Sequence, residues 1–387
     1  MTEAPSLPRA RAEIDLGALR SNLRTLRAAV TPRVRIMAVL KADAYGHGAV
    51  RCARAALDAG ADWLGTATPH EALALRTAGI TGVPLMCWLW APGDPWGQGI
   101  EAGLDMSVSD TWALEEAARA AKALGRAARI HLKADTGLGR NGCPPADWPE
   151  LVRASLIAQA RGHIEVTGLW SHLARADEPH HPSVAAQLGV FRSMLDHAER
   201  AGVRPRVRHL ANSAAALTLP ASHFDLVRPG IALYGLSPGP ELGTSAELGL
   251  RPVMTLKASL ALVKQVPAGH GVGYGHRYVT RDTTTLGLVP LGYADGVPRH
   301  ASGRGPVLVG DRVRTVAGSV AMDQFAVDLG GDTPPPGTEA VLFGPGLRGE
   351  PTAQDWAAAA GTLAYEIVTR VGARVPRVAV DAADEHT

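Results

Sequence analysis

Two lysines stand where apolar stretches of the sequence end. Lys41 follows Met37-Ala-Val-Leu40 and precedes a turn with two glycines, and Lys133 ends the run Ile130-His-Leu. A lysine amine that is removed from water has a lowered pKa, so it can form a Schiff base or accept a proton near neutral pH. A lone lysine at a strand end more often extends its amine to solvent. The residues that accompany each lysine therefore decide between a reactive, desolvated amine and a solvent-exposed one.

Further cations end later apolar runs. Arg140 lies in the glycine-rich loop after Lys133, His172 ends one run, and Arg228 lies in another. Two cations as close in sequence as Lys133 and Arg140 need a compensating anion. A substrate carboxylate, a phosphate or a modified lysine that carries negative charge would supply it.

Two segments are suited to a phosphate group. Asn212 and Ser213 can cap the following helix and donate to a phosphate, although capping alone explains the pair as readily. Backbone N–H groups near Gly230 and Ile231 form a phosphate-sized nest at the usual phosphate position of a barrel. Together with the lysines, these groups favour a phosphate-bearing cofactor that forms a Schiff base, and pyridoxal phosphate fits.

Apolar runs alternate with helical periods between about residues 34 and 235. Helices are predicted at 49–59, 69–78, 111–124 and 184–201. Strands are predicted at 34–41, 62–68, 83–90, 105–109, 129–135, 164–172, 207–211 and 226–234. Eight such units favour an α/β fold of the (β/α)8 TIM-barrel type over a doubly wound sheet, and place the cations at the carboxyl ends of strands, where barrel active sites lie.

The chain changes character after Gly235. A linker rich in proline, glycine and serine is followed by long alternating runs and by one convincing helix at 352–362. The runs lie at 254–266, 283–291, 307–316 and 326–329. We therefore expect a barrel over residues 1–240 and a mostly-β C-terminal domain over residues 246–387.

The composition and net charge limit the kinds of partner that the protein is expected to bind. With 387 residues, 46% hydrophobic and 20% charged, the chain is an ordinary globular protein. Its 39 Lys+Arg and 37 Asp+Glu nearly cancel, so a small molecule is expected rather than nucleic acid or a membrane. Three cysteines without metal or disulfide spacing, and no leader-like or membrane-spanning apolar run, predict a cytoplasmic protein without a metal.

These motifs together resemble the alanine racemase family of fold-type III pyridoxal-phosphate enzymes. The segment Ala38-Val-Leu-Lys-Ala-Asp-Ala-Tyr-Gly-His-Gly48 is similar to the family's cofactor-lysine signature. Further matches keep the family order and extend over nearly the whole chain, at 133–140, 171–172, 211–213, 228–231, 273–275, 292–296 and 322–324. The resemblance implies a barrel followed by a β domain.

The resemblance also implies a reaction, the two-base racemisation of L-alanine and D-alanine with pyridoxal 5'-phosphate, supplying D-alanine for peptidoglycan. Lys41 would hold the cofactor and act as the base on one face of the α-carbon, and Tyr274 would be the base on the other face. His172, linked to Arg228, would favour the phenolate that a tyrosine base needs. Arg228 would face the pyridine nitrogen and leave it unprotonated, which restrains side reactions.

The other matched residues would bind cofactor and substrate. The phosphate would lie against Tyr45, Asn212, Ser213, Gly230 and Ile231. Family members carry the lysine at the position of Lys133 as a carbamate, which would supply the anion expected above.

Substrate contacts would come from both domains. Arg140 would lie beside the carbamate, the Met322 backbone would contact the substrate carboxylate next to Asp323, and Tyr293 would lie at the entrance. In the family the β domain of one subunit closes the barrel of the other, so a homodimer is expected.

Ala373 departs from the family pattern. Members that end in Tyr-Arg-Val-Pro-Arg place a tyrosine near the entrance, whereas this chain has Ala373 there, so a broader amino-acid racemase that accepts serine is the alternative. Ser319 and Ala321 also replace an Arg and a Cys common before Met-Asp-Gln. Arg228 argues against a decarboxylase, and the β domain with Tyr274 argues against a non-catalytic cofactor carrier.

Overall fold

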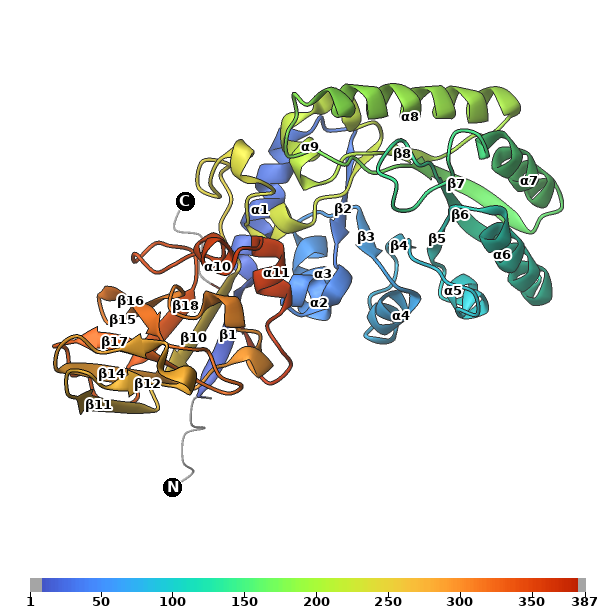
Figure 1. The fold of residues 1–387 in the computed structure, drawn as a ribbon. Helices are drawn as coiled ribbons and strands as arrows, with labels where there is room; N and C mark the ends of the chain where they lie inside the picture. The colour runs from blue at the N-terminus through green and yellow to red at the C-terminus, as the bar shows by residue number, and fades with distance from the viewer. Residues whose placement is uncertain (1–8, 382–387) are drawn as a thin grey trace. The chain divides into compact units, whose positions relative to one another are not determined.

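The protein is described by a computed structural model over residues 9–381, and its chain divides into two units (Figure 1). The barrel unit comprises residues 20–44 and 49–250, and the β unit comprises residues 9–19, 45–48 and 251–381 of the described chain. The N-terminal segment 1–8, which shows no apolar leader, lies outside the described residues. Within residues 9–381 no helix combines the length and apolarity needed to cross a bilayer.

Eight parallel strands form the sheet of the barrel unit, in the order β8-β7-β6-β5-β4-β3-β2-β9. They are β2 (Arg35–Val39), β3 (Trp63–Thr66), β4 (Leu85–Cys87), β5 (Asp105–Val108), β6 (Ala128–Lys133), β7 (Ile164–Trp170), β8 (Val207–His209) and β9 (Leu226–Val227). Backbone hydrogen bonds link the two ends of the sheet: Asp225 N–H donates to the Arg208 carbonyl at 3.0 Å and Arg228 N–H to that of Ala211 at 2.9 Å. The barrel prediction is confirmed, with shorter strands.

Helices follow most of these strands. They are α2 (Lys41–Gly46), α3 (Ala49–Asp58), α4 (Pro69–Thr77), α5 (Trp96–Glu101), α6 (Thr111–Leu124), α7 (Trp148–Ala160), α8 (Pro182–Ala201) and α9 (Ser213–Thr218), and α1 (Leu16–Ala29) precedes β2. Sequence signals fix several of their ends: Thr68 and Glu71 form a capping box at the start of α4, and Gly125 ends α6 in the left-handed conformation. The helices predicted from periodicity are α3, α4, α6 and α8.

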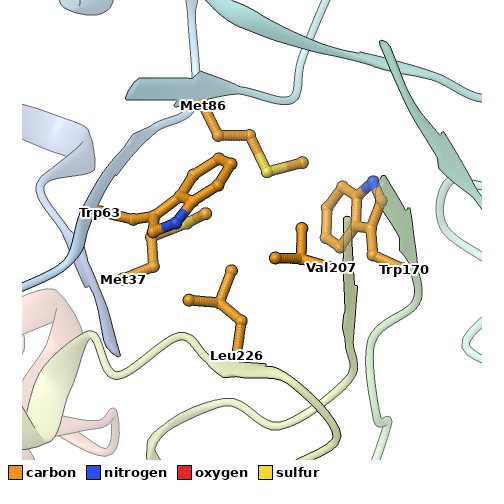
Figure 2. Close-up of a cluster of buried hydrophobic side chains, with 6 residues drawn as sticks. All are labelled: Met37, Trp63, Met86, Trp170, Val207 and Leu226. Carbon is orange, nitrogen blue, oxygen red and sulfur yellow. The ribbon is translucent and has the colours of Figure 1, made fainter. Parts of the chain in front are cut away.

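Apolar side chains from six strands fill part of the barrel interior (Figure 2). This buried cluster consists of Met37, Trp63, Met86, Trp170, Val207 and Leu226. The alternation of inward and outward side chains along each strand places these residues inside the closed sheet. The interior is therefore packed, and polar side chains inside it need partners there.

The β unit is built on a nine-stranded sheet in the order β11-β14-β17-β16-β15-β18-β10-β1-β19. Its strands are β1 (Ala10–Asp15), β10 (Met254–Ser259), β11 (Leu262–Val266), β14 (Thr284–Val289), β15 (Pro306–Val309), β16 (Arg312–Ala317), β17 (Phe325–Gly330), β18 (Glu339–Phe343) and β19 (Arg377–Val380). A two-stranded ribbon, β12 (Gly271–Val272) with β13 (Tyr278–Val279), and the helices α10 (Ala353–Ala360) and α11 (Ala364–Thr369) complete it.

The N-terminal strand lies with the β unit, which differs from the division at residue 240 expected from the sequence. β1 pairs antiparallel with β10 and parallel with β19, and its side chains alternate between buried and half-buried. An isolated strand cannot satisfy its backbone groups, so β1 is assigned by its partners, which lie more than 230 residues away in sequence. Residues 9–19 therefore do not belong to the barrel unit.

Candidate active site

Lys41 begins a short turn with an unusual backbone. The four residues after it, Ala42, Asp43, Ala44 and Tyr45, have φ angles of 53°, 52°, 56° and 53°, in the left-handed region. A residue with a Cβ atom loses about 1–2 kcal/mol in that region, so consecutive left-handed residues persist only where other contacts hold them. Strain of this kind is concentrated at functional sites.

Side-chain acceptors hold this turn. Glu71 accepts the Ala42 N–H at 2.7 Å and, through its other oxygen, the N–H groups of Ala67 and Thr68 at 2.9 and 3.0 Å. Asp43 accepts the Ala49 N–H at 2.7 Å. Sequence analysis did not select Glu71 as a site residue, although its position three residues after Thr68 is the signature of a capping box.

Four cations act on one another at the carboxyl ends of the barrel strands: Lys41, Lys133, Arg140 and Arg228. Burial lowers the pKa of Lys41, and the charges of Arg140 and Arg228 lower it further. Burial, with the charges of Arg228 and Arg140, lowers the pKa of Lys133 to about 7. Such a concentration of positive charge favours an anionic ligand, and at Lys133 it gives an amine that is partly uncharged near neutral pH.

Arg228 is buried and held by several acceptors. Its Nη1 donates to Nδ1 of His209 at 3.0 Å, and its Nη2 donates to the carbonyls of Ser171 and Leu210 at 2.8 and 3.1 Å. The same Nη2 lies 3.2 Å from Nδ1 of His172, so the structure brings these two predicted residues together. Burial lowers the pKa of Arg228 to about 9, which leaves the guanidinium charged at neutral pH.

His172 is neutral in this setting. Burial lowers its pKa well below the usual value, and the nearby charges of Arg228 and Arg140 act in the same direction. A neutral imidazole whose Nδ1 faces a guanidinium carries its proton on Nε2. His172 therefore presents a donor on the side away from Arg228.

The predicted phosphate-binding residues meet after β8 and β9. Oγ of the buried Ser213 accepts the Gly230 N–H at 2.8 Å and the Ala232 N–H at 3.3 Å. Asn212 caps α9, because its side-chain oxygen accepts the Ala215 N–H at 3.1 Å. Ile231 begins the 3-10 turn that follows Gly230. The hydroxyl and N–H groups suited to a phosphate are thus gathered in one place.

Tyr45 is the predicted phosphate ligand that belongs to the β unit. It is buried, burial raises its pKa, and its ring centroid lies 6.3 Å from that of Tyr365. Arg377 Nε donates to the carbonyl of the adjacent Gly46 at 2.9 Å. The phenol of Tyr45 is therefore a protonated group whose ring is fixed by packing.

Tyr274 and its neighbours form an exposed face of the β unit. Gly273 and Gly275 flank Tyr274 with φ angles of 69° and 70°, and the side chain is 78% exposed. A cavity of about 580 Å³ lies against it and is also lined by Ser319 and Ala321, two of the positions that depart from the family pattern.

The loop that carries Met322 packs on the turn that carries Tyr293. Tyr293 N–H donates to the Ala321 carbonyl and Ala294 N–H to the Met322 carbonyl, both at 3.0 Å. The side chains of Tyr293 and Met322 are exposed. Two backbone hydrogen bonds therefore fix the orientation of the backbone at Met322, which is expected to contact the substrate carboxylate.

Arg374 fixes the next residue of this loop. Its Nη1 lies 2.7 Å from Oδ1 of Asp323, and its Nε lies 3.2 Å from Oδ1 of the buried Asp295. Sequence analysis did not select Arg374 or Asp295, which lie in the matched segments 292–296 and 371–377 without a distinctive type or spacing. Ala373, where the family tyrosine is missing, directly precedes Arg374.

Comparison with protein families decides the assignment. The model of the alanine racemase N-terminal domain matches residues 14–238, and that of the alanine racemase C-terminal domain matches residues 253–379. The chain belongs to the alanine racemase family. Both units of this family member are covered by the match.

Individual relatives agree with this membership. Alanine racemase from Streptomyces coelicolor is 68% identical over 384 residues, which cover 98% of each chain, and that from Frankia casuarinae is 60% identical over 95% of each. The solved S. coelicolor structure matches with a TM-score of 0.95 over 97% of this chain and 98% of that one. Alanine racemase from Bacillus anthracis with bound L-Ala-P matches with a TM-score of 0.89 at 33% identity, over 98% of this chain and 97% of that one.

Proposed function

We propose that this alanine racemase family member interconverts L-alanine and D-alanine with pyridoxal 5'-phosphate as cofactor. The observation that carries the proposal is the group of desolvated cations around Lys41, together with the N–H and hydroxyl groups that meet at Ser213 and Gly230. An amine with a lowered pKa suits a carbonyl cofactor, and the neighbouring donors suit its phosphate.

The residues of this chain have separate tasks. Pyridoxal phosphate, when bound, supplies a sink for the electron pair left on the α-carbon. Lys41 binds the cofactor through Nζ and moves the α-proton on one face, and the Tyr274 hydroxyl does so on the other. Arg228 keeps its own proton at neutral pH, so the ring nitrogen that it would face stays unprotonated.

Substrate recognition follows from charge. Arg140 would bind the alanine carboxylate, and the Met322 backbone and Asp323 of a second copy of the chain would complete the contact. Lys133, with a pKa of about 7, is uncharged often enough to react with carbon dioxide, and the resulting carbamate would balance Arg140.

The proposed assembly is a homodimer in the cytoplasm. Tyr274, Tyr293 and Met322 are large apolar side chains that stay exposed on the β unit, as expected where a second copy covers them. Buried free thiols at Cys52, Cys87 and Cys143 suit a reducing compartment. The D-alanine product would serve peptidoglycan synthesis.

The relatives give no support for serine as an alternative substrate, since the proteins from Streptomyces coelicolor and Frankia casuarinae carry the name alanine racemase. The missing phenol at Ala373 remains the one sequence feature that favours it. Polarimetry with L-serine beside L-alanine measures the preference.

Two variants test the proposed reaction. Purified protein should racemise L-alanine in polarimetry, Lys41→Ala should abolish this activity, and Tyr274→Phe should reduce the rate from L-alanine by about 10²-fold or more. Racemisation by Lys41→Ala without an added amine would refute the role of Lys41, and an undiminished Tyr274→Phe rate would remove Tyr274 as a base.

A further inference from the structure

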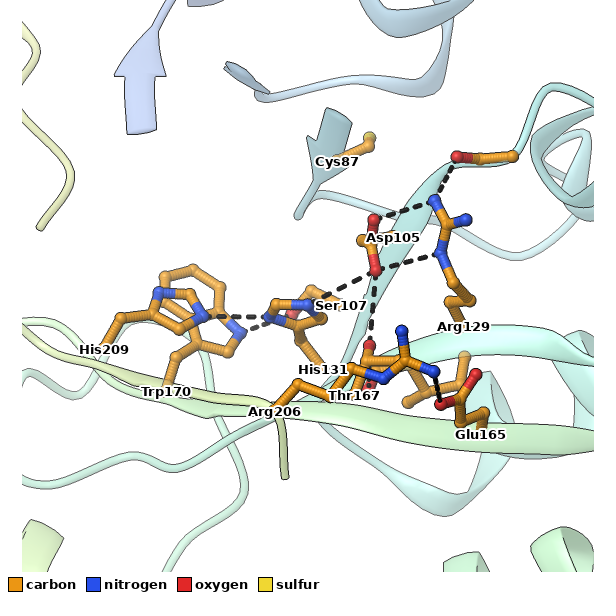
Figure 3. Close-up of polar contacts among 12 residues, drawn as sticks. Cys87, Asp105, Ser107, Arg129, His131, Glu165, Thr167, Trp170, Arg206 and His209 are labelled. Carbon is orange, nitrogen blue, oxygen red and sulfur yellow. Dashed lines mark hydrogen bonds and ion pairs between the residues drawn. The ribbon is translucent and has the colours of Figure 1, made fainter. Parts of the chain in front are cut away.

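A file of buried polar side chains, Asp105, His131 and His209, crosses the barrel interior (Figure 3). The file ends at Arg228. Oδ1 of Asp105 lies 3.6 Å from Nε2 of His131, and Nδ1 of His131 lies 2.9 Å from Nε2 of His209. Nδ1 of His209 in turn accepts from Nη1 of Arg228 at 3.0 Å. The file therefore joins the first residue of β5, at the amino-terminal end of the barrel, to a cation at the carboxyl end.

Only one placement of protons satisfies every member of the file. Arg228 can only donate, so Nδ1 of His209 must be unprotonated and the proton of a neutral His209 lies on Nε2. That proton requires an unprotonated Nδ1 on His131, whose own proton then lies on Nε2. Buried Nε2 of His131 has no hydrogen-bond partner among the described residues and faces the Asp105 carboxylate, which can only accept.

Asp105 is held as an anion. Burial raises its pKa, but His131 and Arg129 outweigh this effect and the net pKa is lowered. Arg129 donates to both carboxylate oxygens, with Nε at 3.1 Å from Oδ1 and Nη2 at 2.9 Å from Oδ2, and Thr167 donates to Oδ1 at 3.3 Å. The acceptor at the far end of the file is thus fixed in both charge and orientation.

Aromatic packing keeps the two imidazoles in place. The Trp170 ring lies parallel to that of His209, with centroids 5.5 Å apart, and Trp63 meets His131 edge-on at 5.6 Å. A side chain at position 168 would overlap the His131 ring, so Gly168 leaves the room that this ring occupies. Ring flips that would reverse the order of donors are therefore sterically opposed.

We propose that Asp105 is a positioning residue for the reaction: by fixing the proton order of His131 and His209, it keeps an acceptor facing Arg228 and so orients the guanidinium. This inference rests on the proposed function, in which Arg228 faces the cofactor. Without this order, the proton of His209 could lie on Nδ1. It would then face the Arg228 N–H, donor against donor, and turn the guanidinium away.

The experiment reads the histidine protons directly. Protein with ¹⁵N-labelled histidine is compared by NMR as wild type, Asp105→Leu and Asp225→Leu. Asp225 is a matched control, because it pairs with Arg208 through Nε at 2.8 Å and Nη2 at 3.1 Å, as Asp105 pairs with Arg129. Within residues 9–381, no hydrogen bond or ion pair joins the Asp225 carboxylate to a histidine side chain.

The file predicts different results for the two variants. Wild type and Asp225→Leu should show His209 with an unprotonated Nδ1, and Asp105→Leu should lose this signature. Asp105→Leu should also change the absorption spectrum of the cofactor-loaded protein and lower kcat about 10–100-fold with little change in KM. Asp105→Asn, whose amide oxygen can still face His131, should restore both readouts.

Two outcomes would overturn the proposal. An unchanged His209 signature in Asp105→Leu would do so, and so would equal spectral changes in Asp105→Leu and Asp225→Leu. If Asp105→Leu does not fold, His131→Phe removes the same link and should give the same loss of signature. Failure of the wild type to racemise alanine would refute the proposed function alone, because the NMR signature is read without turnover.

Discussion

Lys133 and Arg228 lie over the same indole ring. Nζ of Lys133 is 4.4 Å and Cζ of Arg228 is 4.8 Å from the ring centroid of Trp170. The ring face attracts each cation, but the two cations repel each other at a buried position. Lysine is the partner that can yield its proton, since its amine titrates far more readily than a guanidinium. Burial first, and then the charge of Arg228, lower the pKa of Lys133 to about 7.

Carbon dioxide should modify Lys133. An uncharged amine surrounded by Arg140 and Arg228 is suited to form a carbamate, whose negative charge those arginines would stabilise. We expect a carbamate carbon signal in ¹³C NMR after incubation with ¹³C-bicarbonate, and its absence in Lys133→Met. A signal that persists in Lys133→Met would assign the modification to another lysine.

Stability should rise with pH because of Lys133. Between pH about 7 and 10.5 the unfolded lysine binds a proton that the folded one has released, so the unfolding free energy increases with pH over this window. The contribution reaches at most about 1.4 kcal/mol per pH unit. Urea unfolding in carbonate-free buffer should show a smaller slope for Lys133→Met than for the wild type, and equal slopes would contradict the lowered pKa.

The left-handed turn after Lys41 should be strained. Ala42→Gly removes the Cβ atom from an exposed residue at φ 53°, so we expect the variant to be more stable by about 1 kcal/mol. Ala120→Gly in the middle of α6 is the control and should lose about 1 kcal/mol, because that residue is in a right-handed helix. Thermal unfolding of both variants and the wild type at one protein concentration measures whether stability rises in Ala42→Gly and falls in Ala120→Gly.

The absence of a side chain at Gly292 should be required for the position of the loop that carries Ala321 and Met322. A Cβ atom there would overlap the carbonyls of Ala321 and Met322, so Gly292→Ala must displace the loop. If the Met322 backbone binds the alanine carboxylate, KM for alanine rises in this variant. Gly331→Ala, where an added Cβ meets nothing within 4 Å, should leave KM unchanged. An unaltered KM in Gly292→Ala would argue against the contact.

The sequence predicted elements whose signal is local. Apolar composition located the eight barrel strands, most of which are buried along nearly their whole length, and the helical period located α6 with the bounds 111–124. Lys41 and Arg228 stood out by residue type at the ends of apolar runs, whereas Tyr274 was indicated only by the resemblance to a family, which also named the reaction.

The sequence could not assign elements and residues whose state depends on distant partners. Residues 10–15 were included in the expected barrel domain, with no strand predicted there, but they form β1, which pairs with β10 and β19. The partners of a strand depend on which sheet edges are free in the folded protein. Asp105 was not predicted as a functional residue, because a single acidic residue at the start of a strand has no distinctive pattern. Its contacts with Arg129 and His131 exist only because neighbouring parallel strands align these positions.

By itself, then, the sequence determined which side chains can do chemistry and which strands carry them, since both follow from residue type and spacing. Only the tertiary structure decided the pKa values, backbone conformation and hydrogen-bond partners of those residues. Burial set the pKa of Lys133, four consecutive residues were held left-handed beside Lys41, and barrel closure joined Asp105 to Arg228 through two histidines. Each depends on desolvation or on contacts between residues far apart in the chain, which no local pattern contains.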